Sequence, residues 1–221
     1  MKKIHLTVLL IIGLALINVL QAQKTSEEQV AAKDTLWYLN GDYELISDYE
    51  FIEEGRLLNY KNEKGKHRDT ETFFLFSLNN ADGTKNILYK PTMEEEGDTL
   101  TLAEMEAFVA GGALANKNYK ARGALAEGFV VGVASPFLVA SLGSNPFFSI
   151  IIPALNSTVV GVLNPSDKKI RENHPELSKD VMFVEGYKQS AKRKRTKKSI
   201  VGGLVGMLVG ISTVFIIIAT K

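Results

Sequence analysis

The sequence has no cysteine and only three histidines, and both shortages limit its chemistry. Without cysteine the chain cannot form disulfide bonds, thiolate zinc sites or thiol nucleophiles. His5, His67 and His174 lack the spacing of a metal site or a catalytic triad. Gly111 and Gly112 are not followed by the Lys and the Ser or Thr of a phosphate-binding loop. We therefore expect a protein that is not an enzyme, with no catalytic residue, metal or cofactor.

Charged residues are missing from two long stretches, residues 128–163 and 199–220. The 22 residues of the second stretch span roughly 33 Å at about 1.5 Å per helical residue, close to the hydrocarbon thickness of a bilayer. This length predicts a transmembrane helix. The first stretch is too long for one upright helix. With its flank it predicts an apolar membrane hairpin over residues 124–163, kinked at Pro136 and Pro153.

Glycine recurs at every fourth position in both apolar stretches and so falls on one face of each predicted helix. Such a face allows the backbone of another helix to approach closely. We predict helix packing through these glycines, with the partner helix in the same chain or in a second copy. The alternative is that small residues are simply frequent in membrane helices. The residues are Gly202, Gly206, Gly210, Gly128 and Gly132.

Residues 1–22 have the pattern of a secretory signal peptide. Two lysines precede an uncharged run at residues 6–20, and a small-residue site ends at Ala22. We expect cleavage after Ala22. The alternative is an uncleaved anchor helix, because about 17 apolar residues can just span a bilayer. In either case we expect the protein in the cell inner membrane, with residues 23–118 outside the cytoplasm.

The exported part follows a polar linker at residues 23–33. Residues 34–92 contain short β-forming runs separated by turn dipeptides. They predict a small antiparallel β meander or barrel, since closure would hide the sheet edges. We expect the dense apolar run at residues 73–78 to form its core, and a partner-binding face is the alternative. The expected core residues are Phe73, Phe74, Leu75, Phe76 and Leu78.

A helix is predicted over residues 99–118. Thr101 and Glu104 form a capping-box pattern at its start, and apolar residues follow at helical spacing, so the helix should be amphipathic. Gly111 and Gly112 are expected to weaken or end it, because glycine disfavours the helix interior.

The two halves of the chain carry opposite charge. Residues 23–118 hold 10 basic and 19 acidic side chains, net −9, whereas residues 119–221 hold 14 basic and 6 acidic ones, net +8. Residues 164–198 are expected to form a basic loop and an amphipathic helix that ends in a basic run. Nucleic-acid binding is one interpretation of such a run. We favour contact with lipid headgroups and expect no nucleic acid partner, because the run adjoins a transmembrane segment. The headgroup residues would be Lys192, Arg193, Lys194, Arg195, Lys197 and Lys198.

These charges create a conflict over topology. The 11 Lys and Arg residues of segment 164–198 favour the cytoplasm, whereas the signal peptide places residues 23–118 outside. Opposite sides require an odd number of crossings between the two. We prefer a single crossing plus a re-entrant or interfacial arm within residues 124–163. The alternative is that the basic segment lies outside, against an anionic leaflet.

Two runs carry a resemblance to a known family. They are Leu-Ala-Glu-Met-Glu-Ala-Phe-Val-Ala-Gly-Gly-Ala-Leu-Ala-Asn-Lys-Asn-Tyr-Lys at residues 102–120 and Glu-Gly-Tyr-Lys-Gln-Ser-Ala-Lys-Arg-Lys at residues 185–194. With the apolar hairpin between them, they resemble an uncharacterised family of exported membrane proteins common in Bacteroidota. That family has a small β region, a helix, a Gly/Pro-rich apolar segment and a Gly-Tyr-Xaa-Xaa-Xaa-Ala-Xaa-Xaa-Lys signature before a final apolar helix. Gly112 and Leu114 stand where it usually shows an acidic pair. The resemblance implies architecture and no known activity.

Together these patterns predict an α+β membrane protein, a small antiparallel β domain followed by a helix and transmembrane helices. The expected function is non-catalytic. An acidic exported β domain would bind or sense a partner, and a glycine-rich membrane bundle would anchor it. Its partners would be the lipid bilayer and either a second copy of the chain or an envelope protein. The alternative is a small channel or transporter component, which prolines and glycines in membrane helices favour and the lack of intramembrane charge opposes.

Overall fold

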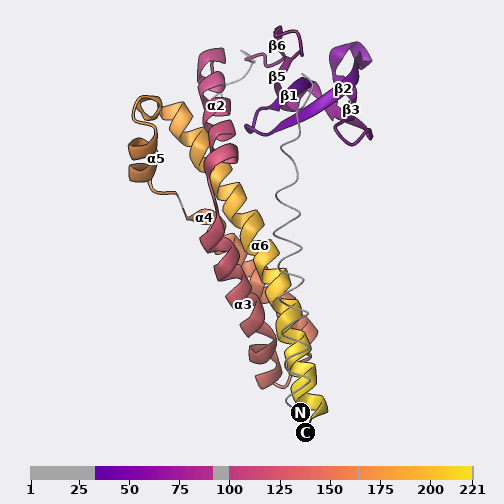
Figure 1. Ribbon diagram of the computed structural model, residues 1–221, viewed down its shortest axis with the longest axis vertical. Helices are drawn as coiled ribbons and strands as arrows, with labels where there is room; N and C mark the ends of the chain where they lie inside the picture. The colour runs from indigo at the N-terminus through magenta and orange to yellow at the C-terminus, as the bar shows by residue number, and fades with distance from the viewer. Residues whose placement is uncertain (1–32, 92–99, 164, 221) are drawn as a thin grey trace. The chain divides into compact units, whose positions relative to one another are not determined.

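The computed structural model describes residues 33–91, 100–163 and 165–220. The predicted signal peptide at 1–22 and almost all of the linker at 23–33 lie outside the described residues. From Asp34 onward the chain forms one compact unit in which strands come first and helices follow (Figure 1). The predicted α+β class is confirmed.

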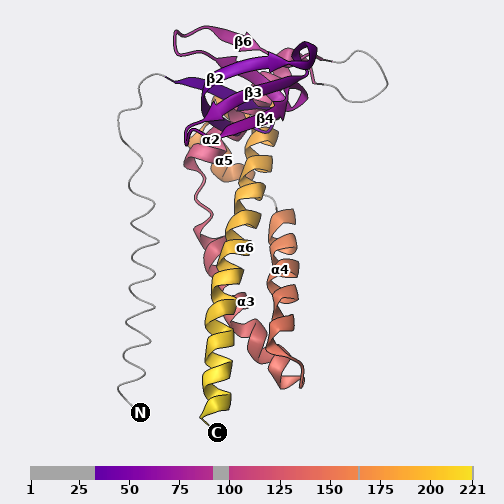
Figure 2. The same ribbon diagram turned by 90° about the vertical axis from the view of Figure 1, so that its right-hand side faces the viewer.

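The β region is an open six-stranded antiparallel sheet with strand order β4-β3-β2-β1-β5-β6 (Figure 2). It is therefore not the closed barrel that was one of the two predicted forms. It is not a simple meander either, because β5 leaves β4 and pairs with β1. That pairing sets Leu78 opposite Leu36 and extends the apolar face across the sheet. The strands are β1 (Asp34–Tyr38), β2 (Tyr43–Ile52), β3 (Leu57–Asn62), β4 (His67–Glu71), β5 (Leu75–Asn79) and β6 (Lys85–Ile87).

One face of this sheet forms the β core. Side chains alternate between the two faces of a strand, and a register shift between β1 and β5 brings Leu75 and Leu78 to the same side although they are three positions apart. Six of them are at most 1% exposed, and each fully buried side chain of this size stabilises the fold by about 1.5–3 kcal/mol. They are Leu36, Ile46, Leu58, Tyr60, Leu75 and Leu78.

The run at residues 73–78 is only partly core. Leu75, Phe76 and Leu78 are buried as predicted, but Phe73 and Phe74 are 75% and 53% exposed. The physical reason is local, because residues Thr72–Phe74 form a 3-10 turn between β4 and β5 and do not join a strand. The two exposed rings pack edge to face with their centroids 5.5 Å apart.

Strand β4 has no apolar residue and was not predicted. It pairs along its whole length with β3, from Leu57 opposite Glu71 to Lys61 opposite His67. His67 therefore begins an edge strand. A charged edge strand protects an open sheet from pairing with other chains.

Helix α2 (Leu102–Asn118) begins with the predicted capping box. The Thr101 hydroxyl accepts a hydrogen bond from the Glu104 backbone N–H, and the Glu104 carboxylate accepts one from the Thr101 N–H at 2.8 Å. The bond from the Thr101 N–H to the carboxylate is the leading cause that lowers the pKa of the Glu104 carboxyl. The helix runs past Gly111 and Gly112 to Asn118, so the glycines do not end it, and the predicted range to residue 118 agrees with the structure.

Helix α3 (Arg122–Ser141) and helix α4 (Ile151–Val162) form an antiparallel apolar pair. They are joined by a turn at Gly143, which has a φ of +70°, and by the 3-10 helix η3 (Pro146–Ile150). Pro136 lies inside α3. Pro153 is the third residue of α4, where a missing N–H costs little, so its position gives no reason to expect a kink in that arm.

Helix α6 (Val181–Ala219) is a single helix of 39 residues, about 58 Å long at 1.5 Å per residue. It follows a short helix α5 (Asp167–Asn173) and a 3-10 turn η4 (Leu177–Lys179). The Asp180 carboxylate caps it by accepting bonds from the N–H groups of Met182 and Phe183 at 2.8 and 3.1 Å. The basic run and the predicted transmembrane helix are thus one continuous rod. α3 and α6 are long and apolar enough to cross a membrane, which is weak evidence for insertion.

Candidate functional site

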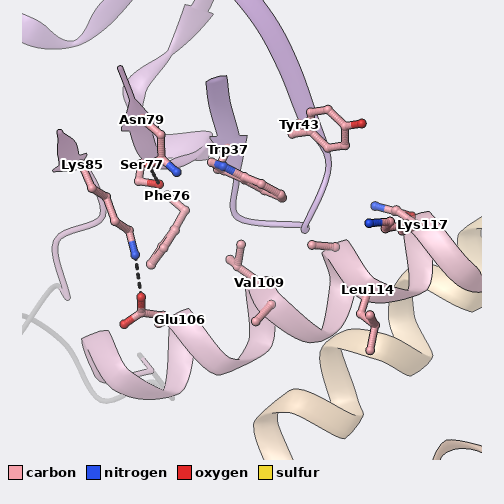
Figure 3. Close-up of a pocket in the computed structure, with 13 residues that line it drawn as sticks. Trp37, Tyr43, Phe76, Ser77, Asn79, Lys85, Glu106, Val109, Leu114 and Lys117 are labelled. Carbon is pink, nitrogen blue, oxygen red and sulfur yellow. Dashed lines mark hydrogen bonds and ion pairs between the residues drawn. The ribbon is translucent and has the colours of Figure 1, made fainter. Parts of the chain in front are cut away.

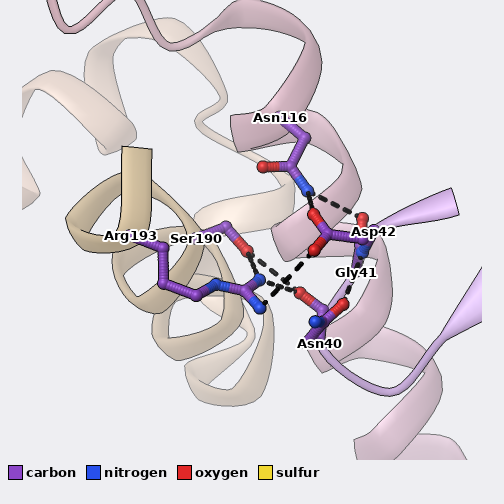
Figure 4. Close-up of polar contacts among 6 residues, drawn as sticks. All are labelled: Asn40, Gly41, Asp42, Asn116, Ser190 and Arg193. Carbon is purple, nitrogen blue, oxygen red and sulfur yellow. Dashed lines mark hydrogen bonds and ion pairs between the residues drawn. The ribbon is translucent and has the colours of Figure 1, made fainter. Parts of the chain in front are cut away.

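A polar cluster joins the β1–β2 turn to α2 and α6 (Figure 4). The Ser190 hydroxyl donates to the Asn40 carbonyl oxygen at 3.1 Å, and the Arg193 guanidinium donates to the same oxygen. Arg193 also lies 3.8 Å from the Asp42 carboxylate. From α2, the Asn116 amide donates to the Asp42 carboxylate at 2.7 Å. Three segments far apart in the sequence therefore meet at one turn.

Gly41 lets this turn approach the helices. Its φ of +77° is a conformation that side-chain-bearing residues rarely adopt. A Cβ at this position would also lie 2.6 Å from the Gly112 Cα, so the turn and α2 touch through their backbones. A Cβ on Gly112 would in turn lie 2.9 Å from the Ser190 hydroxyl. The glycine pair that seemed a helix breaker is thus used for close packing.

Close backbone contact through glycines also holds α2 against α6. A Cβ on Gly111 would collide with the Phe183 carbonyl oxygen, and one on Gly186 would collide with the Phe108 carbonyl oxygen. The two helices therefore cross with backbone on backbone. Tyr187 and Ala191, next to this crossing, are buried against Ala115.

The five predicted packing glycines line the contact between α3 and α6. A Cβ on Gly206 would collide with the Phe129 carbonyl oxygen and lie 2.9 Å from the Val133 nitrogen. A Cβ on Gly210 would lie 2.5 Å from the Val133 carbonyl oxygen. Gly202 lies in the same way against Leu125. Gly128 and Gly132, on α3, lie against Ser199 and Gly203 of α6. The helix opposite these glycines belongs to the same chain.

Three of the six basic residues predicted to contact headgroups bind within the chain. Besides Arg193, Lys194 donates to the carbonyl oxygens of Ala115, Asn116 and Tyr119, at and just beyond the end of α2. Arg195 donates to the Leu163 carbonyl oxygen at the end of α4, at 2.9 Å. Cations at helix C-termini are favourable because they oppose the helix dipole. Lys192, Lys197 and Lys198 have no ion-pair or hydrogen-bond partner in the described part of the chain.

The Asn40 to Arg193 contact bears on topology. A residue of the β1–β2 turn and a residue of the basic segment cannot touch if a bilayer separates them. An odd number of crossings between these two segments is therefore incompatible with this fold. The contact disagrees with the preferred interpretation from the sequence, a single crossing plus a re-entrant or interfacial arm, because that interpretation placed these two segments on opposite sides of a membrane.

A cleft of about 600 Å³ lies between the second face of the sheet and α2 (Figure 3). Trp37 and Tyr43 project from neighbouring strands, with ring centroids 5.2 Å apart, and Phe76 lies beside them. α2 supplies the opposite wall with Val109, Ala110, Ala113 and Leu114.

The two ends of this cleft are polar. At one end Lys85 from β6 and Glu106 from α2 form an ion pair at 2.5 Å, and the Lys85 ammonium lies 5.3 Å from the Phe76 ring centroid. At the other end lie Asn116 and Lys117. An apolar floor with a few polar groups at its rim is the usual form of a ligand site. Trp37 and Tyr43 lie on one face by strand alternation, but no local sequence signal pairs them with α2.

The opposite face of the sheet holds a tyrosine pair. The Tyr38 and Tyr60 hydroxyls are 2.9 Å apart, and both bond to the Glu44 carboxylate, at 3.2 and 2.7 Å. Burial is the leading cause that raises the pKa of both phenols. Both hydroxyls of this group are hydrogen-bonded, and within the described residues no group of three or more His, Asp or Glu side chains is placed to hold a metal ion. The arrangement is typical of a structural polar group.

Comparisons with protein-family models, with curated proteins and with solved structures found no match. The resemblance to the uncharacterised exported family therefore stays a prediction.

Proposed function

We propose that this protein is a non-catalytic, membrane-anchored binding protein of the cell envelope, and that its partner occupies the cleft between the sheet and α2. The observation that carries the proposal is the aromatic wall of Trp37, Tyr43 and Phe76 facing an apolar helix wall. Aromatic residues are enriched at protein binding sites. We propose an apolar segment of an envelope protein as the occupant, anchored at the rim by a polar contact to Lys117 or to the Lys85 and Glu106 pair.

The anchor would be the apolar part of α3, α4 and α6 in the inner membrane. The contact of Asn40 with Arg193 supports a topology in which the sheet and residues 164–198 share one side of the bilayer. The Phe147 and Phe215 rings are 6.1 Å apart, so the α3–α4 turn and the far part of α6 would approach the other side together. With the predicted signal peptide, the shared side would be extracytoplasmic.

The chain offers a direct test of occupancy, because Trp37 is its only tryptophan. Energy transfer from Trp37 to the dye 1-anilinonaphthalene-8-sulfonate is measured with the full chain in nanodiscs. We expect saturable transfer in the wild type. Ala110→Leu, which fills the helix wall, should abolish it, whereas Ala103→Leu, on the same helix outside the cleft, should not. Absence of saturable transfer, or equal transfer in Ala110→Leu, would refute the site.

The partner itself is tested by site-specific photo-crosslinking in cells. A photoreactive residue replaces Lys117 at the cleft rim or, as the control, Lys64 in the exposed β3–β4 turn. We expect a discrete adduct from position 117 alone, and its loss when Ala110→Leu is added. An adduct that survives Ala110→Leu would place the partner elsewhere.

The channel or transporter alternative has less support. Four polar residues in the α4 region bond within the chain, and the buried Ser149 hydroxyl is the exception in the part that the structure describes. Ser157 and Thr158 donate to the Ala154 carbonyl oxygen, and Asn145 caps η3. Asn156 lies 3.4 Å from the Ser199 hydroxyl. None of these groups is left to line a path for an ion. Solute flux in proteoliposomes would favour the alternative.

A further inference from the structure

We propose that a second cleft, between α4 and α6, binds one anionic phospholipid, with its phosphate at Lys192 and Lys197 and an acyl chain along the apolar residues that follow. This inference goes beyond the proposed partner site, because it uses different residues on different helices. The cleft has a volume of about 650 Å³.

The wall from α6 changes character along its length. The lining residues of α6 recur at spacings of three and four and therefore form one stripe on the helix. The first part of the stripe is polar and carries Lys192, Thr196 and Lys197. The next turn is apolar and carries Ile200 and Val201, which are 41% and 43% exposed. The stripe continues with Leu204 and Leu208, also exposed. A polar head followed by an apolar groove matches the two ends of a lipid.

Arg193 also lines the cleft and lies beside Asp42, but the charge of the two cleft lysines is uncompensated. No acidic side chain is among the residues that line it, and neither Lys192 nor Lys197 has an ion-pair or hydrogen-bond partner in the part of the chain that the structure describes. An ammonium group offers three donors and no acceptor, so its natural partner is an oxyanion such as a phosphate diester. The nearby Thr196 hydroxyl is a further donor.

Helix α4 packs closely against this part of α6. A Cβ on Gly161 would collide with the Thr196 hydroxyl, so the helix approaches that side chain only because residue 161 is glycine. Beyond Gly161, α4 exposes Val159 and Leu155, at 62% and 64%. On the α6 side the groove is apolar below the lysines, and a soluble phosphate would leave these residues uncovered.

The structure also divides the basic run by role. Arg193, Lys194 and Arg195 bind carbonyl oxygens of other segments, whereas Lys192 and Lys197 are left for a ligand. The sequence alone groups all of them as headgroup contacts. The site therefore depends on two lysines and not on the whole run.

The test is native mass spectrometry of the full chain in detergent, with phosphatidylglycerol, phosphatidylcholine or soluble glycerol 3-phosphate added. We expect one phosphatidylglycerol to bind in preference to phosphatidylcholine. Lys192→Gln with Lys197→Gln should weaken that binding at least about tenfold, since each lysine near an anionic lipid surface contributes roughly fivefold in affinity. Lys64→Gln with Lys66→Gln removes the same charge from the exposed β3–β4 turn and should leave binding unchanged.

Each other outcome overturns the proposal. Equal weakening by the two double variants would mean diffuse attraction. Equal binding of phosphatidylcholine would mean that the lysines select nothing, and displacement by glycerol 3-phosphate at similar concentration would mean a phosphate site without a lipid. The circular dichroism spectrum checks that the variants fold. Trp37 dye transfer is unaffected in this test, so failure here is distinct from failure of the partner site.

Discussion

Replacing Gly206 by alanine tests the packing of α3 on α6. The added Cβ would collide with the Phe129 carbonyl oxygen and lie 2.9 Å from the Val133 nitrogen. Both opposing atoms belong to a backbone, which cannot rotate away as a side chain can. Overpacking of this kind costs about 1–3 kcal/mol, and alanine regains up to about 1 kcal/mol of helix propensity. We expect a net loss of about 1–2 kcal/mol in the free energy of unfolding.

Gly123→Ala is the matched control. Gly123 lies on α3, and a Cβ there meets nothing within 4 Å, so only the propensity gain of up to about 1 kcal/mol remains. The assay is a titration with sodium dodecyl sulfate in mixed micelles, followed by circular dichroism at 222 nm. Equal stability of Gly206→Ala and the wild type would refute the packing argument. Because α3 of the same chain covers the glycine face, the mass of the protein particle in detergent should be the same for Gly206→Ala and the wild type. A lower mass in Gly206→Ala would instead assign that face to a second copy.

Three further outcomes follow from the contacts. Arg193→Gln should loosen the β1–β2 turn from the helices and lower the free energy of unfolding by about 1–2 kcal/mol, as measured by denaturant titration. Hydrogen bonds to charged groups contribute about 1.5–3 kcal/mol, and the ion pair with Asp42 adds little because it is partly exposed. Because the pKa of the Tyr60 phenol is raised in the folded protein, its contribution to stability is complete below about pH 10. The contribution should fall as the pH rises above about 10, so Tyr60→Phe should flatten the decline in melting temperature at alkaline pH. Phe73→Ser should change stability by less than about 0.5 kcal/mol because the ring is exposed, and a larger loss would contradict its placement outside the core.

Local patterns predicted the elements that depend on local chemistry. The capping box at Thr101 and Glu104 sets the start of α2 by bonds between near neighbours, so the sequence shows it directly. The uncharged stretches likewise correspond to the apolar helices, because the lack of charged residues can be read directly from the sequence. Strand β4 was missed because it has no apolar alternation, and only its pairing with β3 makes it a strand.

Tertiary contacts decided what the sequence missed. Gly111 and Gly112 disfavour a helix in isolation, but α2 continues because these glycines let it touch α6 and the β1–β2 turn. Similarly, Lys192 and Lys194 look alike in the basic run. They differ because Lys194 lies beside the end of α2 and binds its carbonyl oxygens, whereas Lys192 is left as a candidate lipid ligand. The cleft at Trp37 also depends on which helix covers the sheet, which no local pattern encodes.

The central claim is that the sheet and the basic segment lie together on one side of a bilayer, with the α3–α4 turn and the end of α6 on the other. The chain has no cysteine, so single cysteines report their positions without background. Lys64→Cys, Glu185→Cys, Ser144→Cys and Thr220→Cys are labelled with a membrane-impermeant maleimide in intact and in permeabilised cells. We expect positions 64 and 185 to label together and positions 144 and 220 to label in the opposite pattern. Labelling of positions 64 and 185 from opposite sides would contradict the account.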